Sequence, residues 1–440
     1  VFVAAVVAHL FTNDLQSAVL VRAIMGIAAA PLSTLAFYYM LEWLPPARKM
    51  SIGICFGLLG SGMALPLARM ISPDLLQLGG WHGLYLLEVG LALVALAVIY
   101  LLPLTHPPRS KVFDRDDWIS FPLLFIGTGS LVIVLSMGRA YWWFETPWLG
   151  VLLAISIASL ALLAVHELHR KNPMIDLHWL ATRDMLNFAG VLMLFRLLLS
   201  EQSVGVTGLF TSLGIQNEQL IPLFRIIGVS TFLATAGLAL IIKPQRTAAI
   251  HLLALGLIAA GSWLDSHSTV LSRPEQFYLS QAMIGAASAL FLPPALLTGF
   301  GKAMAKGPQY ILSFVTVFLS TQSLGGMIGS AVFSTFVTLR EQFHSNMLLE
   351  NVTLLNPQVA LRIQQYGGAF SRVLTDETER NFRGLTMLGQ AATQQAYVLA
   401  YNDMFLLVTG AAVLTAGLLL LQLGWSSLRR ADVASLQQPN

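Results

Sequence analysis

The sequence predicts an all-α protein, a polytopic bundle of transmembrane helices. Hydrophobic residues make up 56% of its 440 positions and charged residues only 11%, whereas a soluble chain carries about 25% charged residues. Apolar runs of the roughly 20 residues that a membrane crossing needs recur along the chain. The net charge of +3 is too small to indicate nucleic-acid binding. We therefore expect about 12 membrane helices, the first of them truncated.

The first apolar run, residues 1–11, is about half as long as a membrane crossing. It carries neither an initiating Met nor the basic start and cleavage pattern of a signal peptide. We expect the chain to open inside a helix that begins upstream. The runs of full spanning length are residues 16–43, 50–72, 83–103, 118–137, 148–167, 186–212, 221–242, 249–264, 277–300, 310–338 and 398–424.

Lys and Arg residues are divided unevenly between the two sets of connections. One set carries most of them, including Arg48, Lys49, Arg170, Lys171, Lys243 and Arg246, whereas the short connections opposite hold Arg139 and Arg273. Basic residues gather in cytoplasmic loops. We therefore expect the C-terminal tail, residues 425–440, in the cytoplasm and the long segment 340–396 outside.

One predicted span, residues 185–211, carries Arg196 and Glu201 near its middle. A charge at the bilayer centre costs roughly 2.5–3.5 kcal/mol, so such residues usually face a bundle interior or a water-filled cavity. They form either a structural ion pair that locks two helices or part of a solute or proton path. Five residues separate them by about 140° around a helix, so they do not share a face. We expect Glu201 to point inward and Arg196 to be structural.

Four stretches carry patterns specific enough to compare with a family. They are residues 21–27 with 30–32 (VRAIMGI and APL), residues 172–177 (NPMIDL), residues 319–334 with Gly325, Gly326 and Gly329, and residues 401–405 (YNDMF). With them the chain resembles the fourteen-helix drug:proton antiporter branch, the EmrB/QacA type, of the major facilitator superfamily. The resemblance covers essentially the whole chain and implies that the first two helices of the family lie outside it.

The resemblance also implies a domain organisation. Residues 1–104 would be the remainder of the N-terminal helical half, and residues 105–185 two extra linker helices with cytoplasmic connections. Residues 186–424 would be the C-terminal six-helix half, with the external loop 340–396, followed by the tail.

Several residues are candidates for the transport path. Arg22 matches the family arginine that is thought to serve proton transfer. The fifth-helix motif is degraded in residues 63–70, and Glu88 stands where the family tends to have Asn. The proton-coupling or substrate-pathway candidates are Arg22, Glu88, Glu201, Arg196, Arg225 and Asp403, although Asp403 could simply cap a helix N-terminus. The pocket-lining candidates are Phe195, Phe210, Phe224 and Phe232.

The resemblance implies a secondary active transporter of the inner (plasma) membrane that exports small amphipathic or drug-like compounds in exchange for protons. Its partners would be the small-molecule substrate, protons, the lipid bilayer and a periplasmic adaptor protein; no cofactor and no metal is expected. The alternatives are a non-exporting facilitator, a transporter-like receptor, or a membrane-embedded transferase. An enzyme is disfavoured because the chain has no HExxH, no paired Cys/His set and no phosphate-binding loop.

Overall fold

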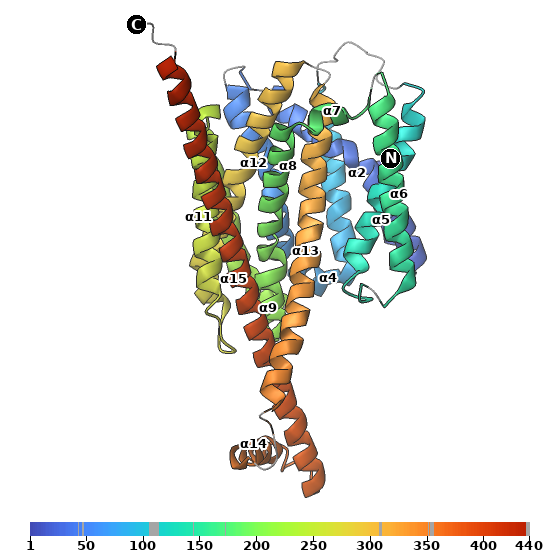
Figure 1. The fold of residues 1–440 in the computed structure, drawn as a ribbon. Helices are drawn as coiled ribbons and strands as arrows, with labels where there is room; N and C mark the ends of the chain where they lie inside the picture. Colours follow the sequence, from blue (N-terminus) through green and yellow to red (C-terminus); the bar gives the residue numbers. More distant parts are fainter. Residues whose placement is uncertain are drawn as a thin grey trace. The chain divides into compact units, whose positions relative to one another are not determined.

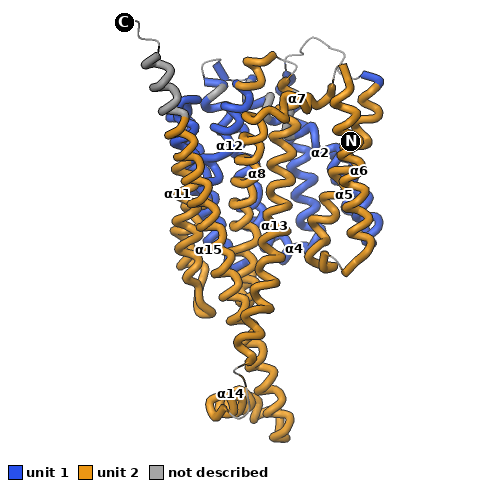
Figure 2. Tube along the Cα trace, viewed as in Figure 1, with its two compact units in different colours: residues 1–115, 217–251, 285–301 blue, residues 116–216, 252–284, 302–440 orange. Residues whose placement is uncertain are grey.

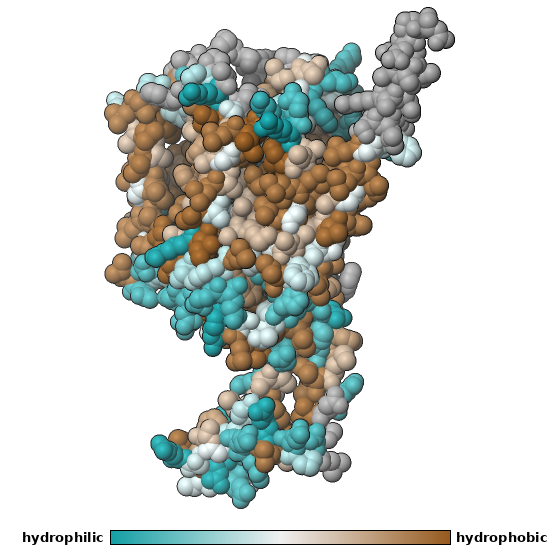
Figure 3. All heavy atoms as spheres, turned by 90° about the vertical axis from the view of Figure 1, so that its left-hand side faces the viewer, coloured by the Kyte–Doolittle hydropathy of each residue, from teal (hydrophilic) through white to brown (hydrophobic). Residues whose placement is uncertain are grey.

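The computed structural model describes residues 1–42, 44–45, 48–104, 114–143, 145–171, 173–307, 310–350, 352 and 356–436. Within these ranges the regular structure is helical and contains no strand, which confirms the predicted all-α fold. Ten helices there are long and apolar enough to cross a membrane. In Figure 3, apolar side chains form a broad band across the face on which α11 and α15 lie in Figure 1. Asn172 of the NPMIDL motif and residues 105–113 of the expected linker region lie outside the described residues.

The chain divides into two compact units, which Figure 2 shows in different colours. Unit 1 contains α1 (Phe2–Ala8), α2 (Leu15–Glu42), α4 (Ile54–Leu101) and α10 (Asn217–Ile241). Unit 2 contains α5 (Asp117–Met137), α6 (Pro147–His169), α7 (Leu177–Leu180), α8 (Arg183–Leu198), α9 (Thr207–Ser212), α13 (Tyr310–Glu350), α14 (Pro357–Gly368) and α15 (Glu377–Leu436). Helices α11 (Thr247–Asp265) and α12 (Tyr278–Lys306) contribute residues to both.

Two predicted spans, residues 50–72 and 83–103, turn out to be joined in the single element α4. The chain changes direction within it at Gly80, whose φ of 57° and ψ of −142° are not helical. A positive φ of this kind is accessible to glycine because it has no Cβ. The break replaces the polar loop that the sequence led us to expect. In unit 1, α4 packs along α10, and α1 lies against α2 and α4.

Small residues hold the centre of unit 2 together. Helix α13 packs against α8 and α15, and α5 packs against α6. At the α8–α13 contact, a Cβ on Gly325 would come within 3.0 Å of the Cβ of Arg196. Ser200, two residues beyond the end of α8, donates a hydrogen bond to the Gly326 carbonyl at 3.3 Å. Glycines therefore allow this close approach, as they commonly do between membrane helices.

The expected external segment is more helical than the apolar runs indicate. Helix α13 continues to Glu350, beyond the predicted end at 338, and α15 begins at Glu377, well before the predicted start at 398. Figure 1 shows the two helices side by side, with α14 beside the start of α15. The helices continue because α14 supplies a packing partner for α15. Helix α14 begins at Pro357, and the Asn356 side chain accepts a hydrogen bond from the Gln358 backbone as its N-terminal cap.

Replacing Gly384 by Ala should detach α14 from α15. A Cβ at Gly384 would overlap the carbonyl oxygen of Ile363 and come within 3.0 Å of the Gly367 nitrogen, both backbone atoms of α14. We expect faster cleavage of the α13–α15 connection in limited proteolysis. Gly389→Ala, where a Cβ would have nothing within 4 Å, is the matched control. Ala is a better helix former than Gly by about 1 kcal/mol, so equal cleavage in both variants would refute the packing argument.

Candidate functional site

The most deeply buried of the charged candidate residues is Glu201, which lies between α8 and α9 where the helical winding changes. Residues Glu201–Val206 form a π-helical turn between α8 and α9. Such turns occur frequently at functional sites. The turn and the start of α9 pack closely against α15. A Cβ added to Gly205 of the turn would lie 2.8 Å from Phe405, and one added to Gly208 of α9 would overlap the Tyr401 hydroxyl. The YNDMF motif of the sequence therefore supplies the helix surface that supports this turn.

Glu201 belongs to a buried polar cluster with Gln281 of α12 and Asp265 of α11. The Gln281 side-chain amide donates to the two Glu201 carboxylate oxygens at 3.2 and 3.4 Å and to Asp265 Oδ2 at 2.8 Å. The exposed fractions of Glu201, Gln281 and Asp265 are 0%, 0% and 3%. Within the described residues, the amide oxygen of Gln281 and the hydroxyl of Ser262 have no hydrogen-bond partner. All these groups come from membrane-length helices of unit 2.

The cluster contains two carboxylates and, among the described residues, no cationic side chain that pairs with them. In the part of the chain that the structure describes, neither Glu201 nor Asp265 has an ion-pair partner. An unpaired buried charge is costly unless it is neutralised. The arrangement can therefore take up a proton or hold a cationic group. Sequence reasoning missed Asp265 and Gln281, because Asp265 directly follows an apolar run, where a charged residue is ordinary, and a neutral Gln gives no charge signal.

Arg196 contacts a different helix from Glu201. Its Nε donates to the Gln322 carbonyl of α13 at 3.2 Å, and its stem covers Gly325 and Gly326. The two residues form no ion pair with each other in the structure. Arg196 thus fixes the α8–α13 contact, whereas Glu201 faces the buried cluster.

Arg22 and Glu88 meet in unit 1. Arg22 Nη1 lies 3.7 Å from Glu88 Oε1, and its guanidinium carbon is 5.9 Å from the centre of the Tyr85 ring. The two side chains are 51% and 34% exposed. An ion pair that is this exposed contributes only about 0–1 kcal/mol to stability. The structure therefore brings two predicted candidates together in an ion pair that contributes little to stability.

No family model matches the sequence. Among curated proteins, the multidrug export protein EmrB of Escherichia coli K12 is 24% identical over 427 residues, covering 92% of this chain and 77% of that protein. The fatty acid resistance protein FarB of Neisseria gonorrhoeae is 23% identical, covering 89% and 75%. The colistin resistance protein EmrB of Acinetobacter baumannii is 19% identical over the same shares.

The resemblance to the EmrB-type exporters is confirmed. These relatives are named for export or resistance, which supports a transport function for the chain. The EmrB-type likeness and the membrane-length helices together make it a multi-pass membrane protein.

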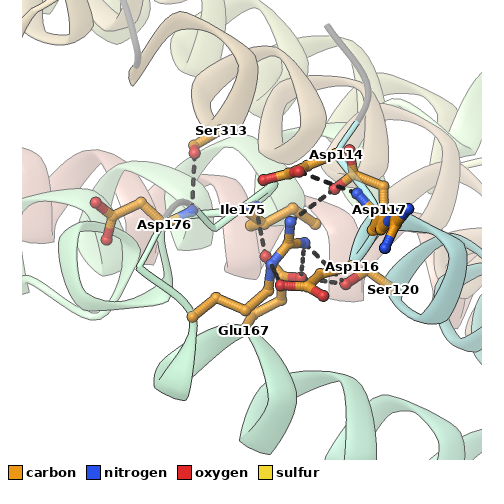
Figure 4. A network of polar contacts seen from close by, with 10 residues as sticks. Asp114, Asp116, Asp117, Ser120, Glu167, Ile175, Asp176 and Ser313 are labelled. Atoms are coloured by element: carbon orange, nitrogen blue, oxygen red, sulfur yellow. Dashed lines mark hydrogen bonds and ion pairs between the residues drawn. The ribbon is translucent and has the colours of Figure 1, made fainter.

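The NPMIDL motif, one of the four that suggested the EmrB type, is held by a buried network in unit 2 (Figure 4). Glu167 at the end of α6 accepts a hydrogen bond from the Ile175 backbone at 3.0 Å. The Asp176 backbone donates to Ser313 of α13 at 2.9 Å, and its carboxylate caps α7. The loop is thereby fixed between α6 and α13.

Arg170 neutralises this network. It lies 2.9 Å from both Asp117 of α5 and Glu167 of α6, with its side chain 4% exposed. Burial alone would lower the pKa of Arg170, but the hydrogen bonds to Glu167 and Asp117 outweigh it and raise the pKa above its usual value. The sequence had marked Arg170 only as one of the basic residues that set orientation.

The remaining charged candidates lie elsewhere. Arg225 is exposed on α10 and belongs neither to the Glu201–Gln281–Asp265 cluster nor to the Arg22–Glu88 pair. Asp403 Oδ2 accepts from Arg340 Nε at 2.6 Å and lies 2.7 Å from His344 Nε2, which joins α15 to α13. The interpretation of Asp403 as an N-terminal cap is wrong, because α15 begins at Glu377 and Asp403 lies well inside it.

The aromatic candidates are mostly core residues in this structure. Phe195, Phe210 and Phe224 are at most 2% exposed. The Phe210 ring packs edge-on against Phe277 with ring centres 4.9 Å apart. Phe232 is 46% exposed and meets Phe56 edge-on. Phe232 therefore has the exposed ring surface that a pocket-lining role requires, whereas the other three rings would need a rearrangement to reach a substrate.

Proposed function

We propose that this chain is a secondary active transporter that exports small amphipathic or drug-like compounds in exchange for protons. The EmrB-type relatives are named for multidrug export and for resistance to fatty acids and colistin. Fatty acids combine an apolar chain with a charged head, which supports an amphipathic substrate class. The non-exporting receptor and the membrane-embedded transferase are not favoured, because these relatives are exporters or resistance proteins.

The buried Glu201–Gln281–Asp265 cluster is the observation that carries the proton coupling. A carboxylate pair inside membrane helices can exchange protons during each cycle, and such intramembrane acids commonly mark proton relays. Gln281 contacts both carboxylates, so a change of charge on one is transmitted to the other through a shared donor. Protonation then alters the charge that the site presents to the compound being exported.

The other candidate residues have secondary places in this proposal. Arg22 and Glu88 are proposed as path residues of unit 1, and Phe232 as a substrate contact. Arg196 and Asp403 bind neighbouring helices and are proposed to hold the transport path in place. Arg225 is retained as a pathway candidate on its exposed face of α10.

The proposed location is the inner membrane with the C-terminus in the cytoplasm, because basic residues collect in the connections on that side. The segment 340–396 is then external. A periplasmic adaptor protein is the proposed partner, and the external ends of α13 and α15 with α14 offer it a surface.

A susceptibility panel tests the function directly. A deletion strain and the same strain expressing the full chain are compared for growth in dyes, fatty acids and cationic antibiotics. We expect the expressing strain to tolerate several amphipathic compounds better, and to lose this advantage when a protonophore removes the gradient. Equal growth on all compounds, or an advantage that survives the protonophore, would contradict proton-coupled export.

A further inference from the structure

His9 is a buried histidine without a partner, in the part of unit 1 where Arg22 and Glu88 meet. It opens the short turn His9–Phe11 after α1 and is 1% exposed. Its ring stacks on that of Tyr85 in α4, with centres 5.0 Å apart and planes 22° apart. Neither ring nitrogen has a hydrogen-bond partner in the described part of the chain.

Such a ring needs an explanation. A neutral imidazole carries one donor and one acceptor, and leaving a buried polar group without a hydrogen bond is unfavourable. Stacking on Tyr85 gives the face of the imidazole ring a packing partner, but it supplies no hydrogen bond to either ring nitrogen. His251 of the same unit shows the ordinary alternative: it is also buried, but its Nε2 lies 3.2 Å from the Phe291 carbonyl.

The charged groups around His9 come from both helices that pack against its turn. Helix α2 contributes Arg22, and α4 contributes Glu88. Tyr85 and Glu88 are three residues apart and share one face of α4, so Glu88 lies one helical turn from the residue that His9 stacks on. The second carboxylate oxygen of Glu88 is buried and, among the described residues, also lacks a hydrogen-bond partner.

We propose that His9 and Glu88 form a second proton-binding site, with Tyr85 positioning the imidazole and Arg22 competing for the carboxylate. The inference rests on the proposed function. At 3.7 Å, the Arg22–Glu88 contact is longer than a hydrogen-bonded ion pair, so Arg22 does not hold the Glu88 carboxylate through a hydrogen bond. A proton on His9 attracts Glu88 and repels Arg22. Glu88 then exchanges Arg22 for His9 as its cationic partner.

Unit 1 then carries a proton site of its own, as unit 2 does at Glu201 and Asp265. More than one proton is bound in each transport cycle. Imidazole suits this role because histidine ordinarily changes charge between about pH 5 and 8. Burial and Arg22 lower the pKa of His9, whereas Glu88 raises it, so the approach of Glu88 is what favours proton uptake by the ring.

Two measurements on the purified full chain test the proposal. The first is a potentiometric difference titration between pH 5 and 8, which counts bound protons without any transport. His9→Phe keeps a ring for Tyr85 to stack on and removes the titrating nitrogens, and His251→Gln is the matched control. We expect His9→Phe to lose one titrating proton and His251→Gln to lose none.

The second measurement is the number of protons moved per molecule of a lipophilic cationic dye in proteoliposomes. We expect the ratio to fall by one in His9→Phe, and also in Glu88→Gln, which keeps the histidine in case the ring replacement does not fold. A titration and a ratio equal to those of the wild type would overturn the second site. A wild-type protein that moves no protons with the dye would instead overturn the proposed function, and the titration would still decide whether His9 binds a proton.

Discussion

Glu201→Gln and Asp265→Asn should each abolish dye export driven by a proton gradient while leaving the protein folded. The replacements keep the shape of each side chain, and an amide oxygen can still accept the hydrogen bond from Gln281. They remove the group that exchanges a proton. A neutral amide avoids the cost of an unpaired buried charge, so the melting temperature should not fall. Export is measured in proteoliposomes with an imposed pH gradient.

The pair should also behave as one unit. Because one amide binds both carboxylates, the double variant should be no worse than either single variant, as is typical of residues in one network. Exchange of dye across the membrane without a gradient should survive, which separates lost coupling from lost binding. Glu218→Gln, at an exposed carboxylate of α10, is the matched control and should export normally. Full gradient-driven export by both single variants would remove the cluster from the mechanism.

The helices were predictable because a membrane span is defined by the length and polarity of a local run. The break at Gly80 was not, since nothing local distinguishes a glycine that ends a helix from one that packs in it. The lengths of α13 and α15 were also missed, because they depend on α14, which packs against α15 in the external segment. Helix continuation there is decided by tertiary contact rather than by hydropathy.

The site was predictable only where a charge interrupts an apolar run. Glu201 gives that signal in the middle of its span, and the structure places it in a buried cluster. Asp265 and His9 stand at the ends of apolar runs, where a polar residue is ordinary, and Gln281 carries no charge. The roles of these three residues depend on which helices pack against one another, and the sequence of a single apolar run does not determine that packing.

Arg170→Met should destabilise the protein strongly. The change removes the guanidinium that lies 2.9 Å from the carboxylate of Glu167, whose side chain is 0% exposed. Breaking a buried ion pair by removing one partner costs roughly 3–5 kcal/mol, because the remaining charge is buried and uncompensated. We expect a clear fall in melting temperature in detergent and faster proteolysis between α6 and α7. Arg183→Met, at an exposed arginine at the start of α8, should leave both unchanged.

Neutralising the orphaned carboxylate should reverse most of this loss. In Arg170→Met with Glu167→Gln the more deeply buried of the two carboxylates is neutral, so the double variant should be more stable than Arg170→Met alone. Alkaline pH should not reproduce the effect within the ordinary range, because the pKa of Arg170 is raised and the guanidinium stays charged until the pH exceeds its usual value. Strong acid should reproduce it, because protonation of Glu167 and Asp117 removes the charges that Arg170 pairs with. An Arg170→Met protein as stable as Arg183→Met would show that the network does not hold α5, α6 and the loop together. Replacing Arg170 should therefore lower stability, whereas replacing Glu201 should remove coupling without lowering stability. This difference separates the structural Arg170 network from the proposed transport site.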